Sequence, residues 1–197
     1  NWEEDDQDDC NSKKDYEDAK RICKKLNIKL NSINFSDKYW DLVFKRFLLE
    51  LENGFTPNPD IYCNKEIKFN YFLKYALSLG ADKIATGHYA KISEDNGQIS
   101  LNMPKDKFKD QTYFLYMLNQ EILENLLFPL EDLNKNEVKS IAKNLDIPLS
   151  EKKESMGICF IGKKNFTNFI DKYIENKQGN ICSMENIILG KHTGLFN

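Results

Sequence analysis

Apolar residues recur every three to four positions through the first half of the chain, and this spacing predicts three amphipathic helices. The first begins at Ser12. The second begins at Ser36 as its N-terminal cap and ends at Gly54, and the third covers residues 65–79 and ends at Gly80. The side chains expected to face a core are Tyr16, Ala19, Ile22, Cys23 and Leu26, then Tyr39, Trp40, Val43, Phe44, Phe47, Leu48 and Leu51, then Ile67, Phe72, Leu73, Ala76 and Leu77.

Shorter apolar runs between these helices predict strands. Residues 28–35 are expected to form one short strand, and residues 82–89 a second strand that runs into a glycine turn. The alternation of helices and strands indicates βαβ units, and therefore an α/β fold with a parallel sheet. Further along, Asp95-Asn96-Gly97 predicts the turn of a β-hairpin.

The second half of the chain is expected to be mainly helical before a short linker. Residues 112–146 are expected to be helical, and Asn134 with Glu137 has the spacing of a capping box. Residues 152–154 are interpreted as a linker into a second region, where residues 166–173 predict a short helix.

Length and composition are typical of a soluble globular chain. With 197 residues, 41% hydrophobic and 30% charged, the chain can bury one ordinary core and a small second domain. No apolar run approaches the roughly 18 residues of a membrane helix, so we expect no membrane segment. The first residue is Asn1 rather than a methionine and no secretory leader is present, so we expect an internal fragment of a cytoplasmic protein.

The net charge of −3 hides an uneven distribution. Residues 1–9 hold six carboxylates and no base, so the remaining 25 acidic and 28 basic side chains give residues 10–197 a net charge of +3. A local phosphate-binding face is therefore compatible with the composition. We interpret the acidic run as a solvated loop rather than as a metal-binding cluster.

The five cysteines are odd in number and irregular in spacing, which argues against the disulfide framework of a small secreted domain. No Cys-x-x-Cys pair occurs and there are two histidines, so we expect no metal site. Cys23 lies on the apolar stripe of the first helix and is expected to be a core thiol. Cys63 and Cys159 instead lie among loop-forming residues, which indicates sulfur chemistry.

Two prolines stiffen the segment 56–64 and hold Asn58, Asp60 and Cys63 in a fixed relation. The segment is either an ordinary turn or a rigid pocket in which an amide and a carboxylate contact the polar edge of a base. We expect a helix to begin just after Asn64, and its positive end would favour the thiolate of Cys63. This last point favours the pocket.

Cys159 lies in the glycine-flanked segment 157–162. It is either a small buried residue on a strand or a reactive thiol on a segment that can move. Two thiols that meet transiently can pass on persulfide sulfur, which suits the pair Cys63 and Cys159.

Two further loops have residue types suited to nucleotide or RNA contacts. Gly87 follows the expected strand at the edge where open parallel sheets bind ligands, so it is either a nucleotide contact or an ordinary turn. His88 beside it is expected to be structural. Lys109, Asp110 and Gln111 either contact phosphate and base edges or form a solvated helix start with Asp110 as its cap.

Five segments together resemble the tRNA-specific 2-thiouridylases (the MnmA/TrmU family), in the family's order: 1–6, 54–69, 84–89, 109–115 and 157–162. The resemblance implies an adenine-nucleotide alpha-hydrolase-like (ATP pyrophosphatase) domain over residues 1–152, with its first strands and pyrophosphate loop missing. It implies that residues 153–197 begin a small central domain, without the family's C-terminal β-barrel.

The resemblance also implies an activity and its residues. Such an enzyme uses ATP, with Mg²⁺, to adenylate the wobble uridine of a tRNA and replaces the C2 oxygen with sulfur. By resemblance, Cys159 carries the persulfide and Cys63 is the nucleophile, and the two form a disulfide during turnover. The remaining implied roles are target-base binding by Asn58, Pro59 and Asp60, acid/base catalysis by Asp60, ATP binding by Gly87, and tRNA binding by Lys109, Asp110 and Gln111.

The partners implied by the resemblance are a tRNA and a sulfur-donor or relay protein, and the chain is expected to be a monomer. Without the pyrophosphate loop, these 197 residues alone are expected not to activate uridine. Two alternatives stay open: another ATP pyrophosphatase, which would not need paired cysteines, and an RNA-binding or sulfur-relay module without its own ATP chemistry.

Overall fold

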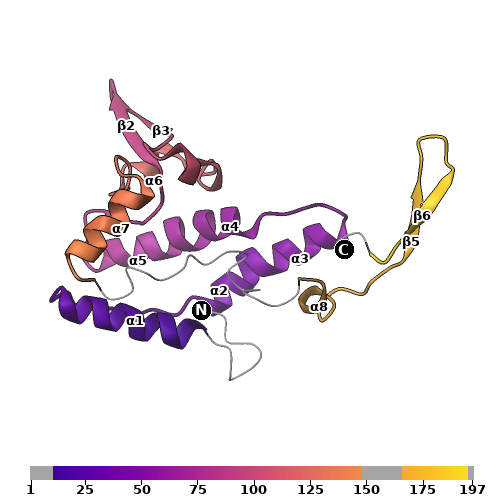
Figure 1. Cartoon of the computed structure of the whole chain (residues 1–197), viewed down its shortest axis with the longest axis horizontal. Helices are drawn as coiled ribbons and strands as arrows, with labels where there is room; N and C mark the ends of the chain where they lie inside the picture. Colours follow the sequence, from indigo (N-terminus) through magenta and orange to yellow (C-terminus); the bar gives the residue numbers. More distant parts are fainter. Residues whose placement is uncertain (1–10, 148–165, 195–197) are drawn as a thin grey trace.

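Two helical segments run antiparallel through the centre of the computed structural model, which describes residues 11–147 and 166–194 (Figure 1). Each segment is a continuous helix that changes its winding along its length. The first consists of α2 (Ser36–Tyr39), η1 (Trp40–Phe44) and α3 (Lys45–Glu52), and the second of α4 (Pro59–Tyr62), η2 (Cys63–Phe72) and α5 (Leu73–Ser78). Both η1 and η2 are π-helical, with hydrogen bonds between residues five apart.

The two ends of the first segment differ in how they are capped. Ser36 is the first helical residue and not the expected cap; the N-cap is Phe35, which makes no side-chain cap hydrogen bond, while Asn34 Oδ1 accepts from the Ser36 amide at 2.8 Å and from its hydroxyl at 2.6 Å. Gly54 has φ +77° and the Phe55 amide donates to the Glu50 carbonyl at 3.0 Å, which is a Schellman ending. The expected end at Gly54 is confirmed.

The π-helical winding of η2 changes which side chains are buried. Phe72 and Leu77 were expected to face inward, yet they are 39% and 38% exposed, whereas Phe69 is 1% exposed. A helix with hydrogen bonds between residues five apart has more residues in each turn than an α-helix, so a period of 3.6 selects the wrong face. Ile67 and Leu73 are buried as expected.

Helix α1 (Asn11–Lys25) forms as expected, but its apolar stripe is not core. Tyr16 and Leu26 are 44% and 45% exposed, and the expected core thiol Cys23 is only partly buried, because the described residues supply little surface against this face. Among residues 14–25 of this helix, the buried side chain is Asp18, which pairs with Arg21 at 2.5 Å.

A short parallel sheet gives the molecule its α/β character. Strand β1 (Ile84–Ala85) pairs in parallel with β4 (Leu126–Leu127), and the Thr86 amide extends the ladder to the Leu127 carbonyl. The strand expected over 28–35 is wrong, since that segment is irregular and has no neighbour within the described ranges to complete a ladder. The continuous helix expected over 112–146 is also wrong, because β4 lies inside it.

The remaining elements of the first part of the chain surround this sheet. Strands β2 (Lys91–Asp95) and β3 (Gln98–Asn102) form the expected hairpin, with Asn96 at φ +51° and Gly97 at φ +77° as in a type I′ turn. The capping box of Asn134 and Glu137 is confirmed. The other elements are η3 (Lys107–Lys109), η4 (Thr112–Phe114), α6 (Gln120–Leu123) and α7 (Lys135–Asn144).

Two apolar clusters hold these elements together. The first joins η2 and α5 to the parallel sheet, and its buried members are Phe69, Leu73, Ile84, Ala90, Leu115, Leu123, Leu126 and Phe128. The second joins η1 and α3 to α8 (Phe166–Ile170), the short helix expected there, and its buried members are Phe44, Phe47, Leu51, Phe169, Ile170 and Ile174.

Beyond α8, the hairpin of β5 (Gly179–Cys182) and β6 (Ile188–His192) projects from the rest of the molecule (Figure 1). None of the helices in the described part of the chain has the length and apolar character that a bilayer crossing requires.

Candidate functional site

Residues 59–64 of the segment expected to be a stiff loop form the beginning of the second helical segment, and residues 56–58 precede that helix. Asn58 is the N-cap, since its Oδ1 accepts from the Asp60 amide at 3.1 Å, and Pro59 occupies the first helical position. The helix therefore begins at Pro59 and not after Asn64. Cys63, a partly buried thiol, lies beyond the first turn, so the expectation that a helix N-terminus favours its thiolate was wrong.

A charged brace fixes this first turn against the neighbouring helix. The Tyr62 hydroxyl donates to the carboxylate of Glu50 at 2.8 Å, and Arg46 Nε donates to the same carboxylate at 2.9 Å. The Arg46 guanidinium also lies 3.9 Å from the centre of the Tyr62 ring. The hydrogen bond to Glu50 raises the pKa of Arg46, and burial followed by the bond to Glu50 raises the pKa of Tyr62.

Asn64 ties the helix that carries Cys63 to η4, which follows Gln111. Its side chain is buried, at 2% exposure, and its Nδ2 donates to the Phe114 carbonyl at 3.1 Å. Its Oδ1 has no hydrogen-bond partner among the described residues. A buried amide seldom leaves its acceptor without a hydrogen bond, so burial of Asn64 Oδ1 costs desolvation free energy. The hydrogen bond from Nδ2 to the Phe114 carbonyl offsets part of that cost.

The Lys109–Gln111 segment is held in place by its own side chains. Asp110 Oδ1 accepts from the Thr112 amide at 3.0 Å and from its hydroxyl at 2.7 Å, as expected of a cap. Gln111 forms two hydrogen bonds with the backbone of Tyr89. Its side-chain Oε1 accepts from the Tyr89 backbone amide at 3.0 Å, and its backbone amide donates to the Tyr89 carbonyl at 2.9 Å. This pair of bonds brings Gln111 beside Gly87.

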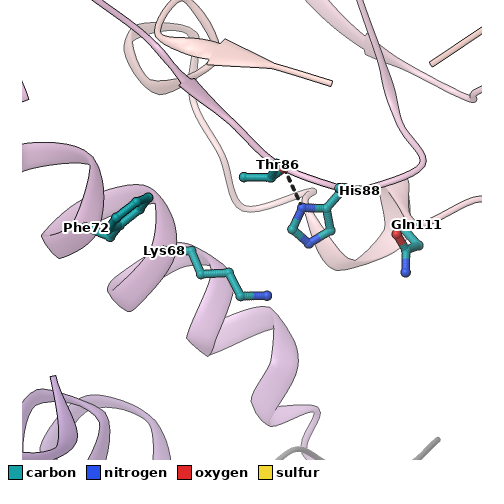
Figure 2. A pocket seen from close by; sticks show the side chains of 6 residues that line it. Lys68, Phe72, Thr86, His88 and Gln111 are labelled. Carbon is teal, nitrogen blue, oxygen red and sulfur yellow. Dashed lines mark hydrogen bonds between the residues drawn. The ribbon is translucent and has the colours of Figure 1, made fainter. Parts of the chain in front are cut away.

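An open hollow of about 400 Å³ lies between η2 and the end of β1 (Figure 2). It contains two of the site residues predicted from the sequence, Gly87 and Gln111. No carboxylate is among the residues that line it, which are Lys68, Phe72, Thr86, Gly87, His88 and Gln111.

His88 is a neutral imidazole at neutral pH. Its Nδ1 lies 2.8 Å from the Thr86 hydroxyl, and its ring packs near Phe69 and Phe128, with ring centres 5.7 Å and 6.2 Å apart. Burial, followed by the positive charge of Lys68, lowers the pKa of His88 from 6.5 to about 4. Only the second ring nitrogen is left to contact a ligand in the hollow.

One predicted site residue, Cys159, lies outside the described ranges, and four residues of the hollow were not predicted as site residues: Lys68, Phe72, Thr86 and His88. Cys159 and the segments 1–6 and 157–162 lie outside the described residues. Lys68 was missed altogether, because a lysine in a helical run is usually a solvated residue; its position five residues after Cys63 carries information only once η2 is seen to be π-helical. Within the described residues, no group of three potential metal ligands occurs.

Comparison with known proteins shows which proteins the chain is similar to. Residues 1–163 match the family model described as the tRNA methyl transferase HUP domain. The chain is 54% identical to the tRNA-specific 2-thiouridylase MnmA of Buchnera aphidicola subsp. Acyrthosiphon pisum, over 100% of this chain and 54% of that protein. It is 51% identical to MnmA 1 of Geobacillus kaustophilus, over 100% of the chain and 53% of that protein, and 50% identical to MnmA of Legionella pneumophila, over 100% and 55%.

The chain thus spans about half the length of the curated relatives that it matches. The resemblance drawn from the five segments is confirmed, and so is the α/β class, which the parallel β1–β4 pair shows directly. This chain belongs to the tRNA methyl transferase HUP domain family.

Proposed function

We propose that the chain is part of a tRNA-modifying sulfurtransferase that thiolates the wobble uridine of a tRNA at C2, using ATP and a cysteine persulfide. The observation that carries the proposal is that the whole chain aligns, at about half identity, with proteins named tRNA-specific 2-thiouridylase. The arrangement of the site supports it. Cys63 and Lys68 lie on the same helix, η2, and Lys68 lines the hollow together with Gly87.

The proposed sulfur transfer involves two cysteines. A donor protein loads Cys159 with a persulfide, and the Cys63 thiolate attacks the inner sulfur of that persulfide. A Cys63–Cys159 disulfide forms and hydrosulfide leaves; the hydrosulfide then attacks C2 of the adenylated uridine and displaces AMP. An external thiol must reduce the disulfide before the next turnover.

The other residues of the proposal bind and orient the substrates. Asn58, Pro59 and Asp60 contact the target base, with Asp60 as an acid/base group, and this fits their position in the first turn of the helix that carries Cys63. Asn58 has a second task there, because its Oδ1 is the helix cap.

The hollow is the proposed contact for the nucleotide substrate. Gly87 binds ATP, with Mg²⁺ as its counter-ion, and the absence of a carboxylate from the residues that line the hollow suits a polyphosphate. Lys109, Asp110 and Gln111 contact the tRNA. Asp110 contributes to that contact mainly by shaping the turn, since Thr112 donates two hydrogen bonds to its Oδ1.

The division of the chain follows the same proposal. Residues 1–152 belong to a nucleotide-hydrolase-like domain, and residues 153–197 begin a second, central domain. Packing of α8 against η1 and α3 is then the contact between the two. A monomeric state, a cytoplasmic location and a sulfur-donor partner complete the proposal.

Cysteine substitutions in the intact protein test the function. Cys63→Ser and Cys159→Ser should each abolish thiolation, measured as retardation of the tRNA in a mercury-containing gel. Cys23→Ser is the matched control and should retain thiolation, because Cys23 lies on α1 (Figure 1) and is not among the residues that line the hollow. Full thiolation by either of the first two variants would refute the mechanism.

ATP turnover separates the proposal from its alternative, an RNA-binding or sulfur-relay module. The intact protein should release pyrophosphate from ATP only when tRNA is present. The 197 residues alone should release none, with or without tRNA. Binding of tRNA by the intact protein without tRNA-dependent pyrophosphate release would favour the relay module.

A further inference from the structure

Lys68 lies on the same face of η2 as Cys63. The hydrogen bonds of a π-helix join residues five apart, so residues 63 and 68 lie one above the other along the helix. In an α-helix, with 3.6 residues per turn, the same two side chains would point about 140° apart. The winding of η2 therefore places residue 68 one turn from residue 63 on the same side of the helix.

The side chain of Lys68 extends from η2 toward His88 and the hollow (Figure 2). No ion pair within residues 11–147 and 166–194 involves Lys68, and none of the residues that line the hollow is acidic. The ammonium group therefore has no carboxylate in this hollow to neutralise it.

Two neutral groups add further hydrogen-bond donors to the same hollow. Gln111 uses its Oε1 to accept from the Tyr89 amide, so its NH₂ group is the end left for a ligand. When the Thr86 hydroxyl donates to Nδ1 of the neutral His88 ring, the ring proton lies on Nε2, which is then a donor as well.

We propose that Lys68 is a positioning residue that binds a phosphate group in this hollow, together with the NH₂ group of Gln111 and Nε2 of His88. One cation and two neutral donors without a competing carboxylate suit a phosphate and no cationic ligand. The phosphate has two sources, the nucleotide substrate or the tRNA backbone. In either case it is held one helical turn from Cys63. The choice of nucleotide and tRNA as phosphate sources rests on the proposed function. The match between the donors of the hollow and a phosphate group does not.

The test compares Lys68→Gln with Lys74→Gln in the intact protein. Lys74 is an exposed lysine of α5 that does not line the hollow, so both variants lose one positive charge from the same helical segment. Calorimetry with a non-hydrolysable ATP analogue and filter binding of tRNA at several salt concentrations measure the two sources separately. Circular dichroism melting confirms that both variants fold.

If the phosphate belongs to the nucleotide, Lys68→Gln should weaken binding of the analogue about 10- to 100-fold, as expected for loss of a charged hydrogen bond. If it belongs to the tRNA, the slope of log K for tRNA binding against log salt concentration should become smaller in magnitude by about one in Lys68→Gln. Lys68→Arg should restore part of the loss in either case. The proposal is overturned if Lys68→Gln and Lys74→Gln bind both ligands equally well.

Failure of this inference and failure of the proposed function look different. Wild-type thiolation together with unchanged binding by Lys68→Gln would reject the role of Lys68 alone. Absence of thiolation by the wild-type protein, with weakened phosphate binding by Lys68→Gln, would reject the function and keep the phosphate site.

Discussion

His88 makes the free energy of unfolding of this domain depend on pH. The pKa of its imidazole is lowered to about 4 in the folded protein, while an imidazole in the unfolded chain titrates near 6.5. Below pH 6.5 the unfolded chain therefore binds a proton that the folded protein does not. The stabilisation is complete above pH 6.5 and is lost as the pH falls toward 4.

The size of the effect follows from the two pKa values. The interval from 6.5 to about 4 corresponds to at most about 3 kcal/mol in the free energy of unfolding, and about 2 kcal/mol of it is lost between pH 7 and pH 5. Because the His88 ring is only partly buried, solvent screening makes these values upper limits.

Urea unfolding followed by circular dichroism at pH 7, 6 and 5 measures this loss in the wild type and in His88→Gln. The glutamine cannot titrate, so subtraction of the two curves removes the contribution of all other groups. The stability advantage of the wild type should shrink by up to about 2 kcal/mol between pH 7 and pH 5. Parallel pH curves for the two proteins would refute the reasoning.

Proton NMR provides a direct check, because the chain contains only two histidines. The spectrum of His192→Gln assigns the remaining imidazole C2 proton to His88. Its chemical shift should titrate near pH 4, and a midpoint near 6.5 would show that the ring is solvated.

Three further substitutions test the packing that supports the site, each by urea unfolding at pH 7. Asn58→Ala removes the cap on the Asp60 amide and should cost about 1 kcal/mol, whereas Asn58→Asp, which can also cap, should cost less. Asn64→Ala removes the bond to the Phe114 carbonyl and should cost about 1–3 kcal/mol; no change would mean that water replaces the bond. Ile170→Ala should cost about 2–5 kcal/mol because Ile170 is fully buried, and a smaller loss would show that α8 is loosely packed.

Features determined by a few adjacent residues could be predicted from the sequence. The Asn96-Gly97 turn, the capping box at Asn134 and the helix end at Gly54 all formed as expected, since each depends on local backbone chemistry. Features that need a distant partner could not. The strand expected over 28–35 lacks a neighbour within the described ranges, and β4 exists because β1 pairs with it.

Part of the candidate site was also accessible to sequence reasoning. The Asn58-Pro59 pair was interpreted as a loop because of its prolines, although an asparagine followed by proline equally describes an N-cap and first helical residue. Gly87 and Gln111 were both predicted as site residues, but only the structure shows that one hollow contains them. Lys68 could not be predicted, since the α-helical period of 3.6 expected for this segment places it about 140° from Cys63 around the helix axis.

The two bonds that Gln111 exchanges with Tyr89 join the proposed tRNA segment to the proposed nucleotide edge. A ligand that favours one position of Gln111 also favours the matching position of Tyr89, two residues from Gly87. Such coupling is reciprocal by necessity: if tRNA tightens the binding of the nucleotide by some factor, the nucleotide tightens the binding of tRNA by the same factor. Under the proposed function, an enzyme coupled in this way would bind its nucleotide more tightly once the tRNA is in place.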